Sequence, residues 1–447
     1  MSGISFGKQN SNYVSKNTAH FFLFVIYAIL FRLIITLIRP YSIDMGGYVA
    51  WSNFMADYGP AQLYGNSGFH IVYAPFYQYF LWLTGEIGKL FSLSTPLHTY
   101  LIKLWSVAFE FLGAWLILKL SEKVDHLKMG SLIALFYVLN PGVFVNSSIW
   151  GQFDSIPATM LLGVLYLFES KKQNLAALLF LIAVLTKPQS GLLLPVVLYL
   201  YFKDFRLDFI SLKRLVMGLL SGIFLYLAIV LPFYIPTSKA GQIPGFLDPF
   251  YFLFDLYSRS IQDYPYATAN GFNIWTLLGG QIQEDTLPFI GLSYFWWGNI
   301  LLVLSVAYAF FCLIKGKASL YAISYFSFLV LFSAFFFMTK MHERYLLPAI
   351  IFIMFSAVFD KSHLLTAVLL SLCVYCNHLY LYIISFNECY WLYRWDGLAL
   401  FFAGLTLMTY ALALYQGYKA FIVPEKKIPA PNAKCQPSIL LVRGDRK

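Results

Sequence analysis

A few short polar motifs interrupt an otherwise apolar chain, and their side chains suit group-transfer chemistry. Lys187 and Arg344 are able to neutralise an anionic headgroup, the arginine through a bidentate fork and the lysine as a point charge. A carboxylate near them is able to take a proton from an attacking hydroxyl. This combination predicts a lipid-phosphate donor and a hydroxyl acceptor.

Each motif also has a structural interpretation. Asp154 could cap the helix that follows it, Lys187 could reach to the membrane interface, and Asp44 could be a solvated loop acid. Residues 342–344 could form an ordinary exposed turn. A functional site is favoured because these ionisable groups gather near one membrane boundary, where they are costly. Asn273 and Trp275 are instead expected to be structural.

The composition sets the class of protein. Of the 447 residues, 60% are hydrophobic, 12% are charged and 19% are aromatic, which is typical of a membrane protein. The net charge of +10 indicates basic cytoplasmic loops facing anionic lipid, and no nucleic-acid partner is predicted. The sequence has no phosphate-binding glycine-lysine loop and no HExxH motif, which argues against a nucleotide-driven pump and a zinc protease of that type. Cys373 and Cys376 are expected to be core residues.

The apolar runs predict an all-α polytopic membrane protein with about twelve transmembrane helices. Ten runs are 19–38, 98–120, 129–147, 153–169, 213–233, 291–314, 319–338, 344–359, 362–385 and 397–415. The stretch 174–202 is interrupted by Lys187-Pro188-Gln189. It predicts two short helices that meet at this break, because proline removes a backbone donor and disfavours helix at the residue before it.

The distribution of Lys and Arg predicts the orientation. Both termini and most basic loops are expected in the cytoplasm, with residues 1–423 as one transmembrane domain and 424–447 as a basic tail. Residues 39–97 then lie outside, so 73–92 is expected to lie along the outer surface. In the alternative, 73–92 crosses the membrane and every later loop changes side. The polar motifs fall on the non-cytoplasmic face, of the plasma membrane in a bacterium or of the endoplasmic reticulum in a eukaryote.

The order and spacing of the polar motifs resemble the GT-C superfamily of membrane glycosyltransferases. The similarity is to the GPI-anchor second-mannose transferases and their bacterial homologues, over most of residues 19–360. Its motifs are Asn140-Pro141, Trp150-Gly151-Gln152-Phe153-Asp154, Thr186-Lys187-Pro188-Gln189, residues 270–275 and Met341-His342-Glu343-Arg344-Tyr345. The resemblance implies a bundle of many helices, with surface-lying helices in the first outer loop.

The resemblance also implies a polyprenyl-phosphate sugar donor, often of mannose, and a catalytic carboxylate early in the first outer loop, here Asp44. We therefore predict an inverting glycosyltransferase in which Lys187, Arg344 and His342 bind the donor phosphate. Residues predicted to contact substrate are Trp150, Gln152, Asp154, Gln189, Glu343 and Tyr345. The loop has one acid where many members have an adjacent pair, so no metal ligand and no cofactor is assigned.

The predicted partners are the sugar donor, a lipid-linked or membrane-associated acceptor, and membrane lipids. A transporter or flippase of lipid-linked sugars is the alternative, since it would also need many helices and phosphate-binding cations. Transporters place their polar sites near the bilayer midplane between internal repeats, and neither feature is evident here. A scaffold subunit would not need the converging charges.

Overall fold

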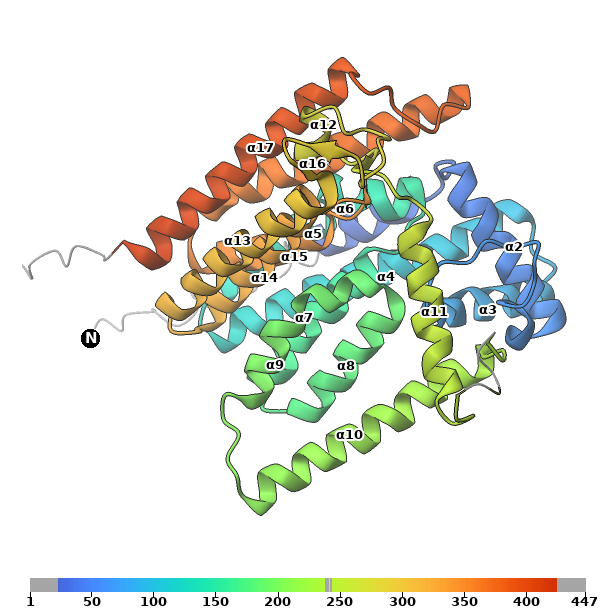
Figure 1. Cartoon of the computed structure of the whole chain (residues 1–447), viewed down its shortest axis with the longest axis horizontal. Coiled ribbons are helices and arrows are strands. Elements are labelled where there is room, and N and C mark those ends of the chain that lie inside the picture. Colours follow the sequence, from blue (N-terminus) through green and yellow to red (C-terminus); the bar gives the residue numbers. More distant parts are fainter. Residues whose placement is uncertain (1–22, 238–240, 242, 424–447) are drawn as a thin grey trace, which may run out of the picture.

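The computed structural model describes residues 23–237, 241 and 243–423, and it is built almost entirely of helices (Figure 1). The predicted tail 424–447 and the start of the first predicted span lie outside the described residues. The described part of the chain begins with the helix Leu23–Ile35, followed by two helices of the first loop, α2 (Ser42–Tyr58) and α3 (Pro75–Leu90), with the 3₁₀ turn η1 (Pro60–Gln62) between them.

The next part of the chain forms a run of antiparallel helices. These are α4 (Thr95–Lys123), α5 (Leu127–Val138), α6 (Pro141–Phe144), the π-helical turn η2 (Val145–Trp150), α7 (Ser155–Glu169), α8 (Gln173–Thr186), η3 (Pro188–Leu193), α9 (Leu194–Phe202), α10 (Phe209–Val230) and η4 (Leu231–Phe233). The predicted break at Lys187 is confirmed: its backbone is extended, and α8 ends immediately before it.

The remaining elements begin with a loop region that carries short strands. They are α11 (Asp248–Gln262), β1 (Thr268–Ala269), α12 (Ile274–Leu277), β2 (Pro288–Phe289), β3 (Leu292–Ser293), α13 (Tyr294–Lys315), α14 (Leu320–Phe337), β4 (Met341–His342), α15 (Pro348–Phe359), α16 (His363–Ile384), η5 (Ser385–Asn387), α17 (Gly397–Gly417) and η6 (Tyr418–Ile422). The parallel pair β1–β4 aligns Thr268 with Met341 and Ala269 with His342.

Seven helical segments in the described part of the chain are long and apolar enough to cross a membrane, which makes this an integral membrane protein. They are Thr95–Lys123, Leu127–Trp150, Phe209–Phe233, Tyr294–Lys315, Leu320–Phe337, His363–Asn387 and Gly397–Ile422. Shorter apolar helices are Leu23–Ile35, Ser155–Glu169, Gln173–Thr186, Pro188–Phe202 and Pro348–Phe359. Whether these shorter helices also cross, as a count of twelve requires, stays a prediction.

Helices α14 and α15 lie at the centre of the bundle and are almost entirely buried. Capping side chains fix where several helices begin: Ser293 starts α13, Ser319 starts α14 and Asp396 starts α17, each accepting a backbone N–H of the first turn. The centre also contains a charged pair. Arg32 of the first helix donates to Glu110 of α4, and both side chains are fully buried.

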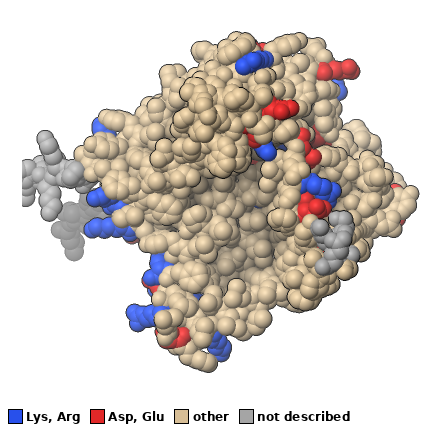
Figure 2. Space-filling view, in the orientation of Figure 1, with Lys and Arg blue, Asp and Glu red and all other residues tan. Residues whose placement is uncertain are grey.

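The charged side chains are distributed unevenly along the molecule. Lys and Arg gather at the end that contains the α9–α10 connection, the α13–α14 turn and the end of α17, on the left of Figures 1 and 2. Helices α2 and α3 pack against each other at the opposite end (Figure 1). Helix α3 has 16 residues and is not among the candidate spans. The orientation of these two ends in the membrane stays a prediction, in which the basic end faces the cytoplasm.

Candidate active site

A tight turn after η2 carries three of the predicted site residues. The backbone carbonyl of Asn146 accepts hydrogen bonds from the N–H groups of Gly151 (3.0 Å) and Gln152 (2.9 Å). Gly151 has φ +96, a left-handed conformation that favours glycine, and a Cβ at this position would lie 2.4 Å from Cε of Met45. The turn therefore depends on glycine, and it aims the side chains on either side of it toward α2.

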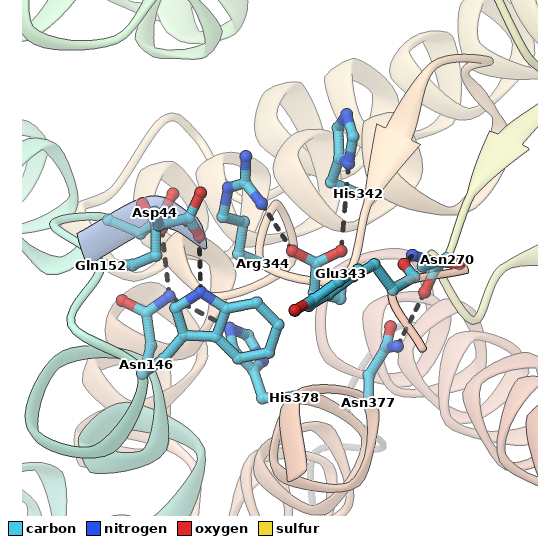
Figure 3. A network of polar contacts seen from close by, with 12 residues as sticks. Asp44, Asn146, Gln152, Asn270, His342, Glu343, Arg344, Asn377 and His378 are labelled. Carbon is cyan, nitrogen blue, oxygen red and sulfur yellow. Dashed lines mark hydrogen bonds and ion pairs between the residues drawn. The ribbon is translucent and has the colours of Figure 1, made fainter. Parts of the chain in front are cut away.

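Asp44 lies in the first turn of α2 and is held from the η2 turn. Its Oδ2 accepts hydrogen bonds from Trp150 Nε1 (2.7 Å) and Gln152 Nε2 (2.6 Å). Among the described residues, none donates a hydrogen bond to Oδ1. Figure 3 shows the carboxylate pointing toward the space that Arg344 also enters. Asp44 is therefore a fixed carboxylate with one unoccupied oxygen, not a solvated loop acid.

Two glycines, Gly46 and Gly47, follow Asp44 closely in the sequence. Both lie within the regular helix α2. Gly47 does line the cavity described below, so its missing side chain leaves room for a ligand beside Asp44.

Asp154 is buried and uses both carboxylate oxygens. Its Oδ1 accepts from Lys187 Nζ at 2.5 Å, and its Oδ2 accepts from Asn146 Nδ2 at 3.1 Å. Although Asp154 precedes α7, its side chain does not cap that helix. Lys187 does not reach to an interface, because its ammonium also lies over the rings of Phe153 (4.6 Å) and Tyr345 (5.7 Å). The two residues thus form one buried ion pair.

The segment after α14 contributes the second cation. Strand pairing with β1 fixes His342, whose ring contacts Tyr264 edge-on at 4.6 Å. Arg344 Nη1 donates to Glu343 Oε1 at 2.5 Å, while Arg344 Nε is buried and has no hydrogen-bond partner among the described residues. Residues 342–344 therefore do not form an exposed turn, and Arg344 keeps donor capacity for a ligand.

Burial shifts the protonation of this segment. The pKa of His342 lies well below its usual 6.5, because the ring is buried and because Arg344 and Lys187 are nearby. Burial likewise raises the pKa of Glu343 above 4.5, and Arg344 opposes that rise. His342 is therefore uncharged near neutral pH, so it is able to form a hydrogen bond to a phosphate but cannot neutralise one.

A cavity of about 940 Å³ joins these groups. Figure 2 shows the face hollowed in the middle of the molecule. The predicted site residues that line the cavity are Asp44, Asp154, Lys187, Gln189, His342, Arg344 and Tyr345. The Oε1 atom of Gln189 is buried without a hydrogen-bond partner among the described residues. A volume of this size suits a small-molecule or lipid headgroup site.

Three predicted substrate ligands do not line the cavity: Trp150, Gln152 and Glu343. Trp150 is buried, and its ring stacks on Tyr41 at 4.1 Å. Trp150 and Gln152 therefore hold Asp44 from behind, and Glu343 holds Arg344 in the same way. Direct contact between these three side chains and a sugar stays an untested prediction that the geometry does not favour.

Two further residues at the site were not predicted. Asn146 Nδ2 also lies 3.0 Å from Nε2 of His378, and Nδ1 of His378 lies 2.9 Å from the carbonyl oxygen of Val374. These contacts assign the ring proton to Nδ1, so that Nε2 accepts from Asn146. His378 could have been found from the sequence, because an ionisable residue within an apolar run is a candidate functional residue. For Asn146 the sequence offered only its position near Asp154.

Asn270 connects the segment after α11 and the segment after η5 to α16. Its backbone adopts a left-handed conformation (φ 65), its Nδ2 donates to the carbonyl of Tyr390 at 2.9 Å, and its carbonyl accepts from Asn377 Nδ2 at 2.8 Å. Asn273 caps α12, and Trp275 Nε1 donates to the carbonyl of Phe337 at 2.7 Å. These contacts are of the kind expected for structural residues, and that role of Asn273 and Trp275 stays a prediction. In the described part of the chain, no three His, Cys, Asp or Glu side chains are grouped to hold a metal ion.

No family model and no curated protein matches this chain. Two solved structures of ArnT from Cupriavidus metallidurans are similar to it. The apo structure has a TM-score of 0.45 at 14% identity and covers 91% of this chain and 78% of that one. The structure bound to undecaprenyl phosphate has a TM-score of 0.47 at 15% identity, with coverage of 90% and 77%. The specific resemblance to GPI-anchor mannosyltransferases stays a prediction.

Proposed function

We propose that this protein is a membrane glycosyltransferase that moves a hexose from a polyprenyl-phosphate donor to a hydroxyl group of a lipid-linked or membrane-associated acceptor. The observation that carries the proposal is the cavity in which a carboxylate with one open oxygen, Asp44, lies with a cation that keeps an unused N–H group, Arg344. Mannose is the sugar we propose, on the sequence resemblance alone.

The proposed reaction inverts the anomeric carbon in one displacement. The acceptor oxygen attacks the anomeric carbon, its proton passes to Oδ1 of Asp44, and the bond between that carbon and the phosphate oxygen breaks. The electron pair of that bond leaves with the polyprenyl phosphate, whose growing charge is stabilised by Arg344. Stabilising the leaving group should be the larger contribution, and general-base catalysis typically adds roughly 10²–10⁴-fold.

The buried contacts support Asp44 as the base over its two rivals. Both oxygens of Asp154 accept hydrogen bonds, and Glu343 does not line the cavity. Lys187 and Arg344 are each paired with a carboxylate at 2.5 Å, but the guanidinium has more N–H donors than its pair with Glu343 uses. We therefore propose Arg344 as the stronger phosphate ligand. We propose that Asp154, Gln189 and Tyr345 contact the sugar or the adjoining isoprenoid.

The proposal is tested with purified protein in detergent, a short hydroxyl-bearing glycolipid acceptor and a set of defined polyprenyl-phosphate hexoses. Mass spectrometry should detect acceptor that has gained one hexose, together with free polyprenyl phosphate in equal amount. A lipid-linked sugar that crosses a vesicle membrane unchanged, without any transfer, would identify a transporter and overturn the proposal.

A further inference from the structure

An apolar stripe on α14 runs along the cavity toward Lys340, a residue to which the proposed mechanism assigns no role. Leu331, Ala334, Phe335 and Met338 all line the cavity. The spacing of Leu331, Ala334 and Phe335 places them on one face of α14, and Met338 follows directly after its last residue. Lys340 follows two residues after Met338 and lines the same cavity. A lipid tail lying along this stripe would therefore bring its headgroup to Lys340.

Lys340 is held more loosely than the other cations at the cavity. Its Nζ lies 3.6 Å from Oδ2 of Asp285, whereas Lys187 lies 2.5 Å from Asp154 and Arg344 lies 2.5 Å from Glu343. The Asp285 oxygen is already bonded to the hydroxyl of Thr339 at 2.9 Å. The side chain of Lys340 is 25% exposed, compared with 4% for Lys187. It is thus free to turn toward an incoming anion.

The backbone at Lys340 is also unusual. Its φ of 65 is a left-handed conformation that a long side chain adopts rarely. The N–H of Lys340 donates to the carbonyl of Tyr266 at 2.8 Å, which fixes this conformation from the neighbouring loop. The backbone from which the Lys340 side chain projects is consequently fixed at the end of the α14 stripe, while the ammonium group itself stays free to turn. Such locally strained positions cluster at functional sites.

We propose that Lys340 is a phosphate ligand for the lipid-linked donor, with the donor tail lying along the α14 stripe. The proposal rests on the donor class given above and adds a residue to it. Lys340 and Arg344 together supply the positive charge that the phosphate meets, while Lys187 chiefly neutralises Asp154. The ammonium binds as a compact point charge with three donors, so it tolerates headgroups that approach from different directions.

The test measures binding of a polyprenyl monophosphate, without a sugar, to the purified protein and to three variants. Lys340→Gln should weaken binding by about tenfold or more, because it removes a charge-assisted hydrogen bond. Lys340→Asn removes the same charge and suits a left-handed backbone, so it should weaken binding equally while preserving the fold. Both variants should bind the uncharged polyprenol as the unmodified protein does.

The variant Asp285→Asn distinguishes two roles of Lys340, as a phosphate ligand or as one member of a structural ion pair with Asp285. It keeps an acceptor for Thr339 but frees the lysine, so polyprenyl-phosphate binding should be unchanged or tighter. If Asp285→Asn weakens binding as much as Lys340→Gln, or if both Lys340 variants bind normally, then the role of Lys340 is overturned and the donor class stands. If the unmodified protein does not bind the polyprenyl phosphate, the donor class itself fails.

Discussion

At the scale of single residues, the three carboxylates that the sequence predicted for the site differ in how their oxygens are used. Asp44 has one oxygen held by two N–H donors and the other unoccupied by described residues. Asp154 has both oxygens occupied, and Glu343 is paired with Arg344 behind the cavity wall. A proton acceptor needs a lone pair that faces its substrate, so among these three carboxylates Asp44 best fits the general base that we propose.

Replacing Asp44 by asparagine should lower kcat by roughly 10²-fold or more, because the amide keeps the size of the side chain and removes the base. Donor binding should change little. The measurement is sugar transfer under saturating donor, with Asp57→Asn on the same helix as the control, since Asp57 pairs with Lys89 at the far end of α2. Normal turnover in Asp44→Asn together with an inactive Asp154→Asn would move the base to Asp154.

His342 should not change its charge between about pH 6.5 and pH 8. Its pKa lies well below 6.5, and a base with a lowered pKa gains a proton only when the pH falls further. Donor affinity should therefore show no His342-dependent step in this range. The check is the dissociation constant of polyprenyl phosphate against pH, for the unmodified protein and for His342→Gln. A rise in affinity on passing below about pH 7 that His342→Gln abolishes would mean that the imidazole is a cation at the site.

At the scale of elements, the turn that follows η2 connects the two halves of the site. Asn146 holds the turn through its carbonyl and holds Asp154 through its amide, and the turn presents Trp150 and Gln152 to Asp44. Single-turn π-helical segments are frequent at functional sites. The position of Asp44 therefore depends on the backbone of a segment about one hundred residues away.

Gly151→Ala should damage the site through this turn. The left-handed backbone costs a residue with a side chain about 1–2 kcal/mol, and the new methyl group would also meet Met45. Thermal unfolding in detergent should show reduced stability, and kcat should fall because the two donors to Asp44 move. Gly222→Ala in α10 is the matched control, since its Cβ would meet nothing within 4 Å. Equal behaviour of the two variants would show that the turn does not position Asp44.

The sequence predicted the elements around the site better than the contacts between them. Pro188 indicated the break at Lys187, because proline acts on its immediate neighbour. The pairing of Lys187 with Asp154 joins residues 33 positions apart and depends on how α7 and α8 pack, which local patterns do not specify. For the same reason, the sequence indicated Trp150 and Gln152 as site residues but not that they lie behind Asp44.

At the scale of the whole molecule, the two ends differ both in their charged side chains and in the helices that form them. Basic side chains gather at one end, and the helices of the first loop pack together at the other (Figures 1 and 2). Basic residues are retained on the cytoplasmic side during insertion, so the end that carries α2 and α3 is expected to face outward.

Cysteine accessibility tests this orientation. On a background from which the five native cysteines have been removed, Lys89→Cys in α3 and Lys171→Cys between α7 and α8 should react with a membrane-impermeant maleimide from opposite faces. Both side chains are exposed, so a lack of reaction reports the membrane barrier and not burial. The expected result is labelling of Lys89→Cys from the outer face and of Lys171→Cys from the cytoplasmic face. The reverse pattern would mean that 73–92 crosses the bilayer, because every later segment then changes side.

The buried pair between Arg32 and Glu110 has a consequence for how this protein is made. The two residues are 78 positions apart, so a ribosome that adds roughly 5–20 residues per second exposes the arginine about 4–16 seconds before its partner. During that interval the first helix carries an unneutralised cation, which costs about 2.5–3.5 kcal/mol at the centre of a lipid-facing helix. We expect the first helix to remain beside the insertion machinery until α4 emerges, so that the two enter the lipid as a unit.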